Sequence, residues 1–312
     1  MNKPSVVVGF NADLQTLIWY DSQGNLQFKA EPSGSAATIT RVLNLHGDTR
    51  VTTLITIGDD EEGQMLVSKL SSQNWVEPIV VRLKTSATVF EVSNKEGFPD
   101  MFTGRRGEYK AQALATADEI LIPLLNDHDQ SWRIAVGASP QDLHLSQLLL
   151  GRIPGKRIFL PGKTLVYSED IRKFEGLADI FICNQDEYRA ILQFRDRSQE
   201  TDFEWMHAFF GARLVVVTCN SHGVEASFEN QAIQLPAVKV VELCDIAAGD
   251  TFLGALAHEI IYSKNGSGSR VNTVSELTQS RVVDALGYAT SYAAKKVALP
   301  TPIDFPLLGV AA

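Results

Sequence analysis

Cysteines and basic residues are both in short supply in this chain of 312 residues. The 28 Lys and Arg are outnumbered by 37 Asp and Glu, which gives a formal net charge of −9 at pH 7. Proteins that bind nucleic acid need a basic surface, so we expect no nucleic-acid partner. The three cysteines, Cys183, Cys219 and Cys244, show no paired spacing, and this is typical of reduced thiols in a cytoplasmic protein.

Long apolar runs and targeting signals are missing as well. No apolar stretch approaches the ~18 residues that a membrane-spanning helix requires, so no membrane partner is expected. Met1–Pro4 leads directly into a strand-like run without the apolar core of a signal peptide, and a cytoplasmic location is therefore predicted. Apolar residues make up 45% of the chain and charged residues 21%, which is ordinary for a globular protein with a sizeable core.

Short apolar runs of the buried-strand type alternate with helical stretches along the chain. Such alternation predicts βαβ units and a mostly parallel sheet flanked by helices, an α/β fold. Two hairpins, at 17–29 and 87–97, interrupt the alternation and predict a small separate β-sheet. We expect one domain over 1–312 with β insertions near 14–32 and 82–106. The strands predicted outside the hairpins are 5–10, 119–124, 132–137, 157–160, 179–183 and 214–218.

The most informative stretch runs from Cys244 to Leu256 and contains Ala247-Ala248-Gly249-Asp250 at the start of a predicted helix. The first amides of a helix have no internal partner, and the helix dipole adds partial positive charge, so anions bind there. An acid beside a phosphate site repels the anion, which suggests that Asp250 serves in proton transfer or metal binding. The alternative is that Asp250 caps the helix, and the local pattern leaves both interpretations open.

Polar residues follow two of the predicted strands, and ligands bind at such strand ends in open α/β sheets. Asn11 and Asp13 follow the strand 5–10, while Asn184 and Glu187 follow the strand 179–183. An Asx turn explains the first pair equally well, and a helix-capping pattern explains the second. Pro161-Gly162-Lys163-Thr164 does not form a P-loop motif, because Arg157 occupies the position of the required earlier glycine.

These motifs, in this order, resemble the ribokinase-like, or PfkB, carbohydrate kinases. The run from Cys244 to Leu256 is similar to the second signature of that family, D-T-x-G-A-G-D-x-F-x-G-A-L, and Ser33 to Thr38 is similar to the first, G-G-S-A-A-N. Six positions depart from the family's residues: Ser33 (Gly), Thr38 (Asn), Asn220 (Gly), Cys244 (Asp), Asp245 (Thr) and Ala247 (Gly).

The resemblance implies ATP-dependent phosphorylation of a hydroxymethyl group on a small, ribose- or fructose-like carbohydrate. Asp250 would be the base, and the amides of Ala247, Ala248 and Gly249 would stabilise the transferring phosphoryl group. The β insertions would form a lid over the sugar and, in some members, a homodimer interface. The implied sugar-binding residues are Asn11, Asp13, Gly34, Ser35 and Thr38, and the implied nucleotide-binding residues are Asn184, Glu187, Thr218, Gly223 and Thr290.

The implied cofactors are ATP and Mg²⁺, with Glu187 holding the metal ion through water, and family members often respond to K⁺. Thr290 lies in a small-residue helix that packing alone would also explain. Two other functions stay open at this stage. One is a nucleoside kinase of the same family, and the other is a non-catalytic regulator that binds a sugar or a nucleotide, which the departures at Cys244, Ala247, Thr38 and Asn220 make conceivable.

Overall fold

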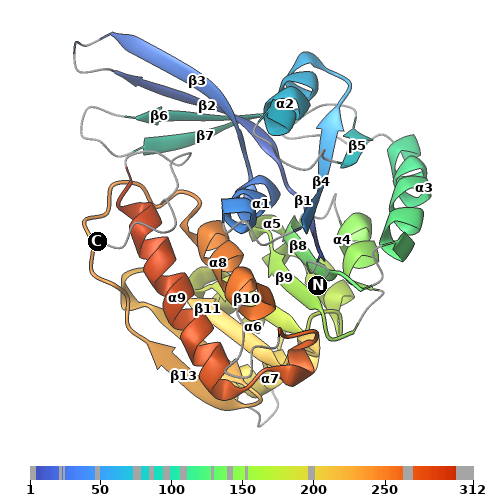
Figure 1. The fold of residues 1–312 in the computed structure, drawn as a ribbon, viewed down its shortest axis with the longest axis vertical. Helices are drawn as coiled ribbons and strands as arrows, with labels where there is room; N and C mark the ends of the chain where they lie inside the picture. The colour runs from blue at the N-terminus through green and yellow to red at the C-terminus, as the bar shows by residue number, and fades with distance from the viewer. Residues whose placement is uncertain are drawn as a thin grey trace.

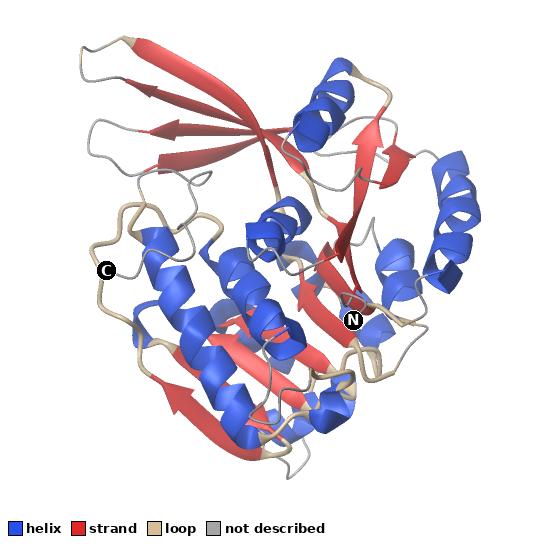
Figure 2. Cartoon of the chain, viewed as in Figure 1, coloured by secondary structure: helices blue, strands red, loops and turns tan. Residues whose placement is uncertain are grey.

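A computed structural model describes most of the chain. The described residues form a layered α/β body and a smaller four-stranded sheet at one end of it (Figures 1 and 2). Within them, no helix is both long enough and apolar enough to span a membrane. The described residues are 5–20, 23, 25–45, 50–72, 79–83, 88–93, 99–105, 111–127, 130–138, 143–151, 154–195, 201–262 and 270–299.

The central sheet has nine strands in the order β13-β12-β11-β10-β9-β8-β1-β4-β5. The strands from β11 to β5 all pair in parallel, and β12 pairs antiparallel with both β11 and β13. The predicted mostly parallel sheet is therefore confirmed. Its strands are β1 (Ser5–Phe10), β4 (Arg50–Gly58), β5 (Ile79–Leu83), β8 (Trp132–Ala138), β9 (Arg157–Pro161), β10 (Ile180–Asn184), β11 (Leu214–Thr218), β12 (Val224–Phe228) and β13 (Gln231–Leu235).

Helices cover both faces of this sheet. The near face in Figure 1 carries α1, α8 and α9, whose apolar residues join one core cluster. The second core cluster contains residues of α3, α4, α5, α6 and α7, and α2 contributes to a third, smaller one. The helices are α1 (Ser35–Leu45), α2 (Glu61–Ser72), α3 (Ala111–Asp127), α4 (Leu143–Leu150), α5 (Lys163–Val166), α6 (Gln185–Leu192), α7 (Asp202–Phe210), α8 (Ala248–Tyr262) and α9 (Gln279–Val297), with 3-10 turns at Glu169–Phe174, Asn220–His222 and Val274–Glu276.

The predicted strand at 119–124 is wrong, because these residues lie inside α3. The apolar run there buries Leu121 and Leu125, which are four residues apart, and leaves Glu119 and Pro123 exposed. This spacing places the buried residues one helical turn apart, whereas a strand would bury every second residue.

Helices α1 and α8 pack closely through Gly254. A Cβ atom at this position would lie 2.8 Å from the Cβ of Val42 on α1, so only glycine allows the observed approach. Nearly every residue of α8 from Thr251 onward is buried. Packing thus explains why the second signature has a glycine at position 254. The close approach of the two helices also brings together Ser35 and Asp250, which lie in their first turns.

The smaller sheet has the order β3-β2-β6-β7 and projects from the upper left of the body in Figure 1. Its strands are β2 (Asp13–Tyr20), β3 (Leu26–Ser33), β6 (Thr88–Ser93) and β7 (Pro99–Arg105). Both predicted hairpins supply strands to it, although the turn predicted at 94–97 lies outside the described residues. The predicted insertion 82–106 starts too early, because residues 82–83 belong to β5 of the central sheet.

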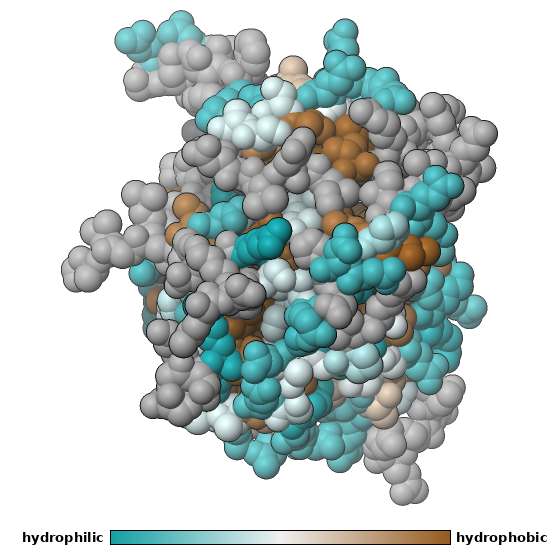
Figure 3. Space-filling model, turned by 45° about the vertical axis from the view of Figure 1, so that its right-hand side comes forward, coloured by the Kyte–Doolittle hydropathy of each residue, from teal (hydrophilic) through white to brown (hydrophobic). Residues whose placement is uncertain are grey.

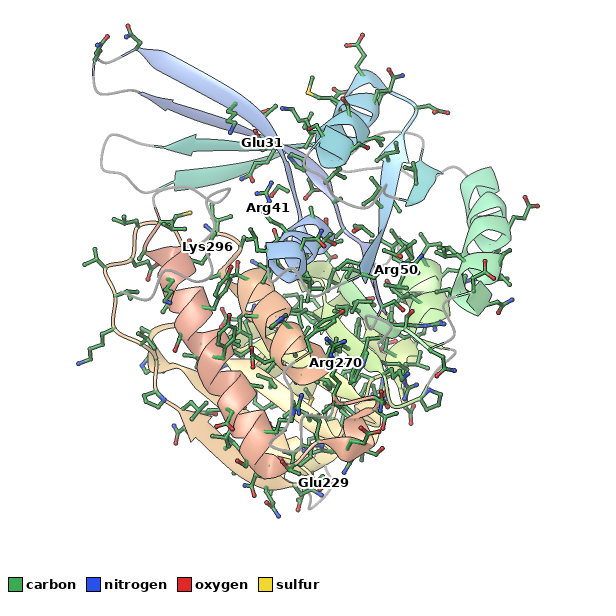
Figure 4. All side chains as sticks on the ribbon, viewed as in Figure 1. Glu31, Arg41, Arg50, Glu229, Arg270 and Lys296 are labelled. Carbon is green, nitrogen blue, oxygen red and sulfur yellow. The ribbon has the colours of Figure 1, made fainter. Side chains whose placement is uncertain are left out.

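Charged residues line the junction between the two sheets. Glu31 of β3 is buried and forms an ion pair with Lys29 at 3.0 Å. Figure 4 shows Arg41 on the side of α1 that faces the smaller sheet.

Hydrophilic side chains dominate the described part of the face in Figure 3, with smaller hydrophobic patches between them.

Candidate active site

A cavity of about 280 Å³ lies at the carboxyl ends of the central strands. The ends of β1, β8, β9, β10 and β11 and the amino-terminal turns of α1 and α8 all contribute residues to it. Because parallel strands end at the same edge of a sheet, residues far apart in sequence meet there. The polar or charged residues that line it are Asn11, Ser35, Lys163, Asn184, Glu187, Thr218, Asp245 and Asp250.

The amino-terminal turn of α8 presents free backbone N–H groups to this cavity. The carbonyl of Ala247 accepts the first helical hydrogen bond, from the N–H of Thr251 at 2.9 Å, so Ala247 is the capping residue. Asp250 is therefore the third residue of the helix, and its interpretation as a cap is wrong. The N–H of Ala248 donates to the carbonyl of Asp245 at 3.0 Å, while the N–H groups of Ala247, Gly249 and Asp250 have no partner among the described residues.

Ala247 has a left-handed backbone conformation, with φ of 64°. This conformation costs a residue with a Cβ atom about 1 kcal/mol or more, and the family signature has glycine at this position. Ala247→Gly is therefore expected to raise the free energy of unfolding by about 1 kcal/mol. Ala248→Gly, one residue later inside the helix, is the matched control and is expected to lower it by about 0.5–1 kcal/mol. Equal losses for both variants in denaturant titrations would contradict the strain at Ala247.

Asp250 lies among other acidic groups. The pKa of its carboxyl is raised from 3.8 to about 6. Burial is the main cause, the negative charges of Glu187 and Asp13 contribute to the rise, and a hydrogen bond with Ser35 opposes it. Burial also raises the pKa of Asp13 to about 6. A carboxylate with a pKa near the working pH is well suited to accept a proton.

Asn11 is held in place by two glycines. Gly34 lies against its backbone, and the carbonyl of Asn11 accepts a hydrogen bond from the N–H of Ala36 at 2.8 Å. Gly137, at the end of β8, has φ of 60°, and a Cβ atom there would lie 2.5 Å from the Asn11 amide nitrogen. Gly137 lines the cavity and was missed in the sequence, because a single glycine after a strand carries no motif.

Asn184 and Glu187 form a reciprocal capping box at the start of α6. The Asn184 side-chain oxygen accepts the N–H groups of Asp186 and Glu187 at 3.0 and 2.9 Å, and the Glu187 carboxylate accepts the N–H of Asn184 at 2.9 Å. Both side chains also line the cavity. The capping interpretation is therefore confirmed, and it coexists with a place in the site. Burial raises the pKa of Glu187, and the positive charge of Lys163 opposes this shift.

Several residues expected at the site do not line the cavity. Thr38 is buried within α1, and Gly223 closes the loop after β11 through the hydrogen bond from the Cys219 N–H to its carbonyl. Thr290 is buried in α9, where its hydroxyl donates to the carbonyl of Leu286 at 2.8 Å. This contact agrees with the packing interpretation of that helix. Asp13 lies just outside the lining residues, close enough for its charge to raise the pKa of Asp250.

Asp13→Asn is expected to stabilise the protein at pH 8. The carboxyl of Asp13 has a pKa of about 6 in the folded state and an ordinary value of 3.8, so the folded state binds the proton more tightly than the unfolded state. The contribution of Asp13 to stability therefore falls as the pH rises from about 4 to above 6. The variant should gain about 1–3 kcal/mol at pH 8, and the gain should shrink below pH ~6.

The control for this prediction is Asp284→Asn, because Asp284 is exposed on α9 and makes no recorded contact among the described residues. Its free energy of unfolding should match that of the wild type at both pH values. An Asp13→Asn variant that is no more stable than the wild type at pH 8 would contradict the raised pKa of this carboxyl.

Solved structures of known proteins share this fold. The chain is similar to ribokinase from Thermotoga maritima, with 20% identity over 96% of this chain and 94% of that chain and a TM-score of 0.69. It is also similar to phosphofructokinase-2 from Escherichia coli in complex with fructose-6-phosphate, with 17% identity over 95% and 94% and a TM-score of 0.69. The ribokinase-like fold is thus confirmed.

The family resemblance is confirmed as well. Residues 158–297 match the family model described as pfkB family carbohydrate kinase. This segment runs from β9 to the end of α9 and contains Lys163, Asn184, Glu187 and Asp250. The chain is also similar in fold to a PfkB protein from Polaromonas sp. JS666, with 17% identity over 95% of this chain and 96% of that chain and a TM-score of 0.67.

Proposed function

We propose that this protein is an ATP-dependent kinase that phosphorylates a hydroxymethyl group of a small carbohydrate. The observation that carries the proposal is the position of Asp250. Its carboxyl, with a pKa of about 6, lines the cavity at a helix terminus whose neighbouring N–H groups are free. A base and an anion-binding site at one point are what phosphoryl transfer to a hydroxyl group requires.

The strand order divides the cavity residues into two sets, one near β1 and one near β10 and β11. Asn11 and Ser35 lie on the acceptor side, at the ends of β1 and the start of α1, whereas Asn184 and Thr218 lie at the ends of β10 and β11, where we place the nucleotide. Asp250 accepts the proton of the acceptor hydroxyl, and the free N–H groups bind the equatorial oxygens of the transferring group. Phosphoryl transfer has a loose transition state, so this positioning matters more than base strength.

Magnesium fits this site as an ion that arrives with the nucleotide. Among the described residues, no group of three His, Cys, Asp or Glu side chains could hold a metal ion on its own. Glu187 lines the cavity beside Asn184, where its carboxylate suits a contact to the water shell of Mg²⁺, an ion that keeps several waters and binds substrate phosphates. When bound, the ion neutralises charge on the phosphates.

A small sugar is the acceptor class that we favour. One of the similar solved structures is of a ribokinase, and another is of phosphofructokinase-2 in complex with fructose-6-phosphate. The four-stranded sheet joins the body next to Asn11, because β2 begins at Asp13. We propose that this sheet is a lid that excludes water from the sugar, which would prevent ATP hydrolysis, and that it is also the contact surface of a homodimer.

The experiment that tests the function is a measurement of ADP release from Mg-ATP across an acceptor panel. The panel holds pentoses, ketohexoses, sugar phosphates, sugar acids and nucleosides. We expect turnover with at least one carbohydrate. Turnover with nucleosides alone would show that the acceptor is a nucleoside and not a sugar. No turnover with any compound of the panel, combined with retained binding of ATP or a sugar, would indicate a regulator instead.

A further inference from the structure

The charges around the cavity are strongly unbalanced. Glu187, Asp245 and Asp250 line it as carboxylates, and Asp13 is close enough to influence Asp250. Lys163 is the one basic residue among the described residues that line it. ATP carries several negative charges, so a cavity with three acids and only uncharged amide donors would repel the terminal phosphate. This single cation therefore needs an explanation.

The backbone beneath Lys163 is firmly anchored. Lys163 is the first residue of α5, directly after the end of β9. Leu165 and Val166 are fully buried in the core cluster, and the N–H of Leu165 donates to the carbonyl of Gly162 at 2.9 Å. The side chain of Lys163 is exposed toward the cavity rather than buried. A side chain on a rigid element can be positioned more precisely than one on a loop.

The order of the strands puts Lys163 between the two sides of the site. Strand β9 lies between β8, which carries Gly137 next to Asn11, and β10, which ends in Asn184. Among the described residues, no hydrogen bond or ion pair occupies the ammonium group, and its recorded electrostatic partner is Glu187 on the nucleotide side. The charge is thus free to meet a ligand in the cavity, between the end of β10 and the end of β8.

We propose that Lys163 binds the terminal phosphate of ATP and holds it during transfer. The inference rests on the nucleotide-binding part of the proposed function and adds a contact residue to it. A lysine ammonium is a compact charge with three hydrogen-bond donors, which suits phosphate oxygens. Lys163 supplies hydrogen bonds and charge and gives up no proton, so Asp250 remains the group that accepts the acceptor's proton.

The test compares Lys163→Ala with Lys163→Arg and with the control Lys173→Ala. Lys173 is an exposed lysine of the next segment that pairs with Asp170 at 2.8 Å and does not line the cavity. Calorimetry without acceptor should show that Lys163→Ala weakens ATP about tenfold or more and ADP clearly less. Turnover should fall about 10- to 100-fold, and Lys163→Arg should recover part of both losses. Unchanged thermal melting of all variants shows that the fold is intact.

Three results would overturn the assignment. These are an unchanged ratio of ATP to ADP affinity in Lys163→Ala, an equal effect of Lys173→Ala, and a loss confined to acidic acceptors with ATP affinity unchanged, which would place the bound anion on the acceptor. The two proposals fail separately. A wild-type protein without turnover that still needs Lys163 to prefer ATP over ADP would refute the kinase and support the phosphate contact.

Discussion

Asp250→Asn should lower turnover by about 10²- to 10⁴-fold, the usual contribution of a general base. The carboxylate lies in the cavity at the helix terminus with free N–H groups, and its carboxyl has a pKa of about 6. Asparagine has almost the same volume and can keep the hydrogen bond with Ser35, but it cannot accept the hydroxyl proton. The N–H groups of Gly249 and Asp250 belong to the backbone, so ATP affinity should change little.

Steady-state turnover with the best acceptor, together with calorimetric titration of ATP, checks this prediction. Asp284→Asn makes the same chemical change at an exposed position of α9 and should keep wild-type turnover. If Asp250→Asn turns over as fast as the wild type, then Asp250 is not the base. A parallel loss of ATP affinity would instead assign Asp250 to nucleotide binding.

The rate should also depend steeply on pH on the acid side. Asp250 must be ionised to accept a proton, and its carboxyl has a pKa of about 6 in the free protein. As the pH falls through this value the protonated, inactive form accumulates, so kcat/KM should drop about tenfold per pH unit below pH ~6. A carboxyl with an ordinary pKa of 3.8 would instead keep kcat/KM constant down to about pH 4.

Asp13 gives this pH profile a specific signature. Its negative charge is one of the causes that raise the pKa of Asp250, so Asp13→Asn should move the midpoint to lower pH, whatever it does to the absolute rate. The control Asp284→Asn should leave the midpoint unchanged. A rate that stays constant between pH 5 and 8, or a midpoint that moves upward in Asp13→Asn, would contradict the electrostatics of the site. The pH values of 5 and 8 lie about one unit or more on either side of the expected midpoint, so the change in rate should be visible between them.

The sequence predicts well where local chemistry repeats a motif. The run from Ala247 to Asp250 begins a buried helix as expected, and Asn184 and Glu187 reach the same cavity from a different strand. Each of these residues follows a strand or starts a helix, and the parallel order of the strands is enough to bring such ends together. The α/β fold follows from the same alternation.

Secondary structure and site residues are predicted poorly from the sequence where tertiary contacts determine them. The run at 119–124 has two β-branched residues, Ile120 and Ile122, yet its burial on one side of α3 makes it helical. Strands β4 and β5 extend the sheet beside β1 and were not predicted. Thr290 occupies a position that the family resemblance links to the nucleotide, but its hydroxyl is bonded within α9.

Two residues of the site could not be found from the sequence. Gly137 is required by its approach to Asn11, a contact between strands far apart in the chain. Lys163 was set aside with a failed P-loop motif, and its importance appears only when the lining of the cavity shows that the surrounding charges are negative. Contacts of this kind form only in the assembled sheet, so no local sequence pattern predicts them.

The most direct test of the proposed activity follows the terminal phosphate itself. ATP labelled in its γ-phosphate is incubated with the protein and the best acceptor of the panel, and the labelled products are separated. The account predicts that the label moves to the acceptor as an acid-stable phosphate ester, and that this transfer is lost in Asp250→Asn. Label that stays on ATP, or that appears as inorganic phosphate alone, would contradict the assignment of this cavity as the site of phosphoryl transfer to a carbohydrate.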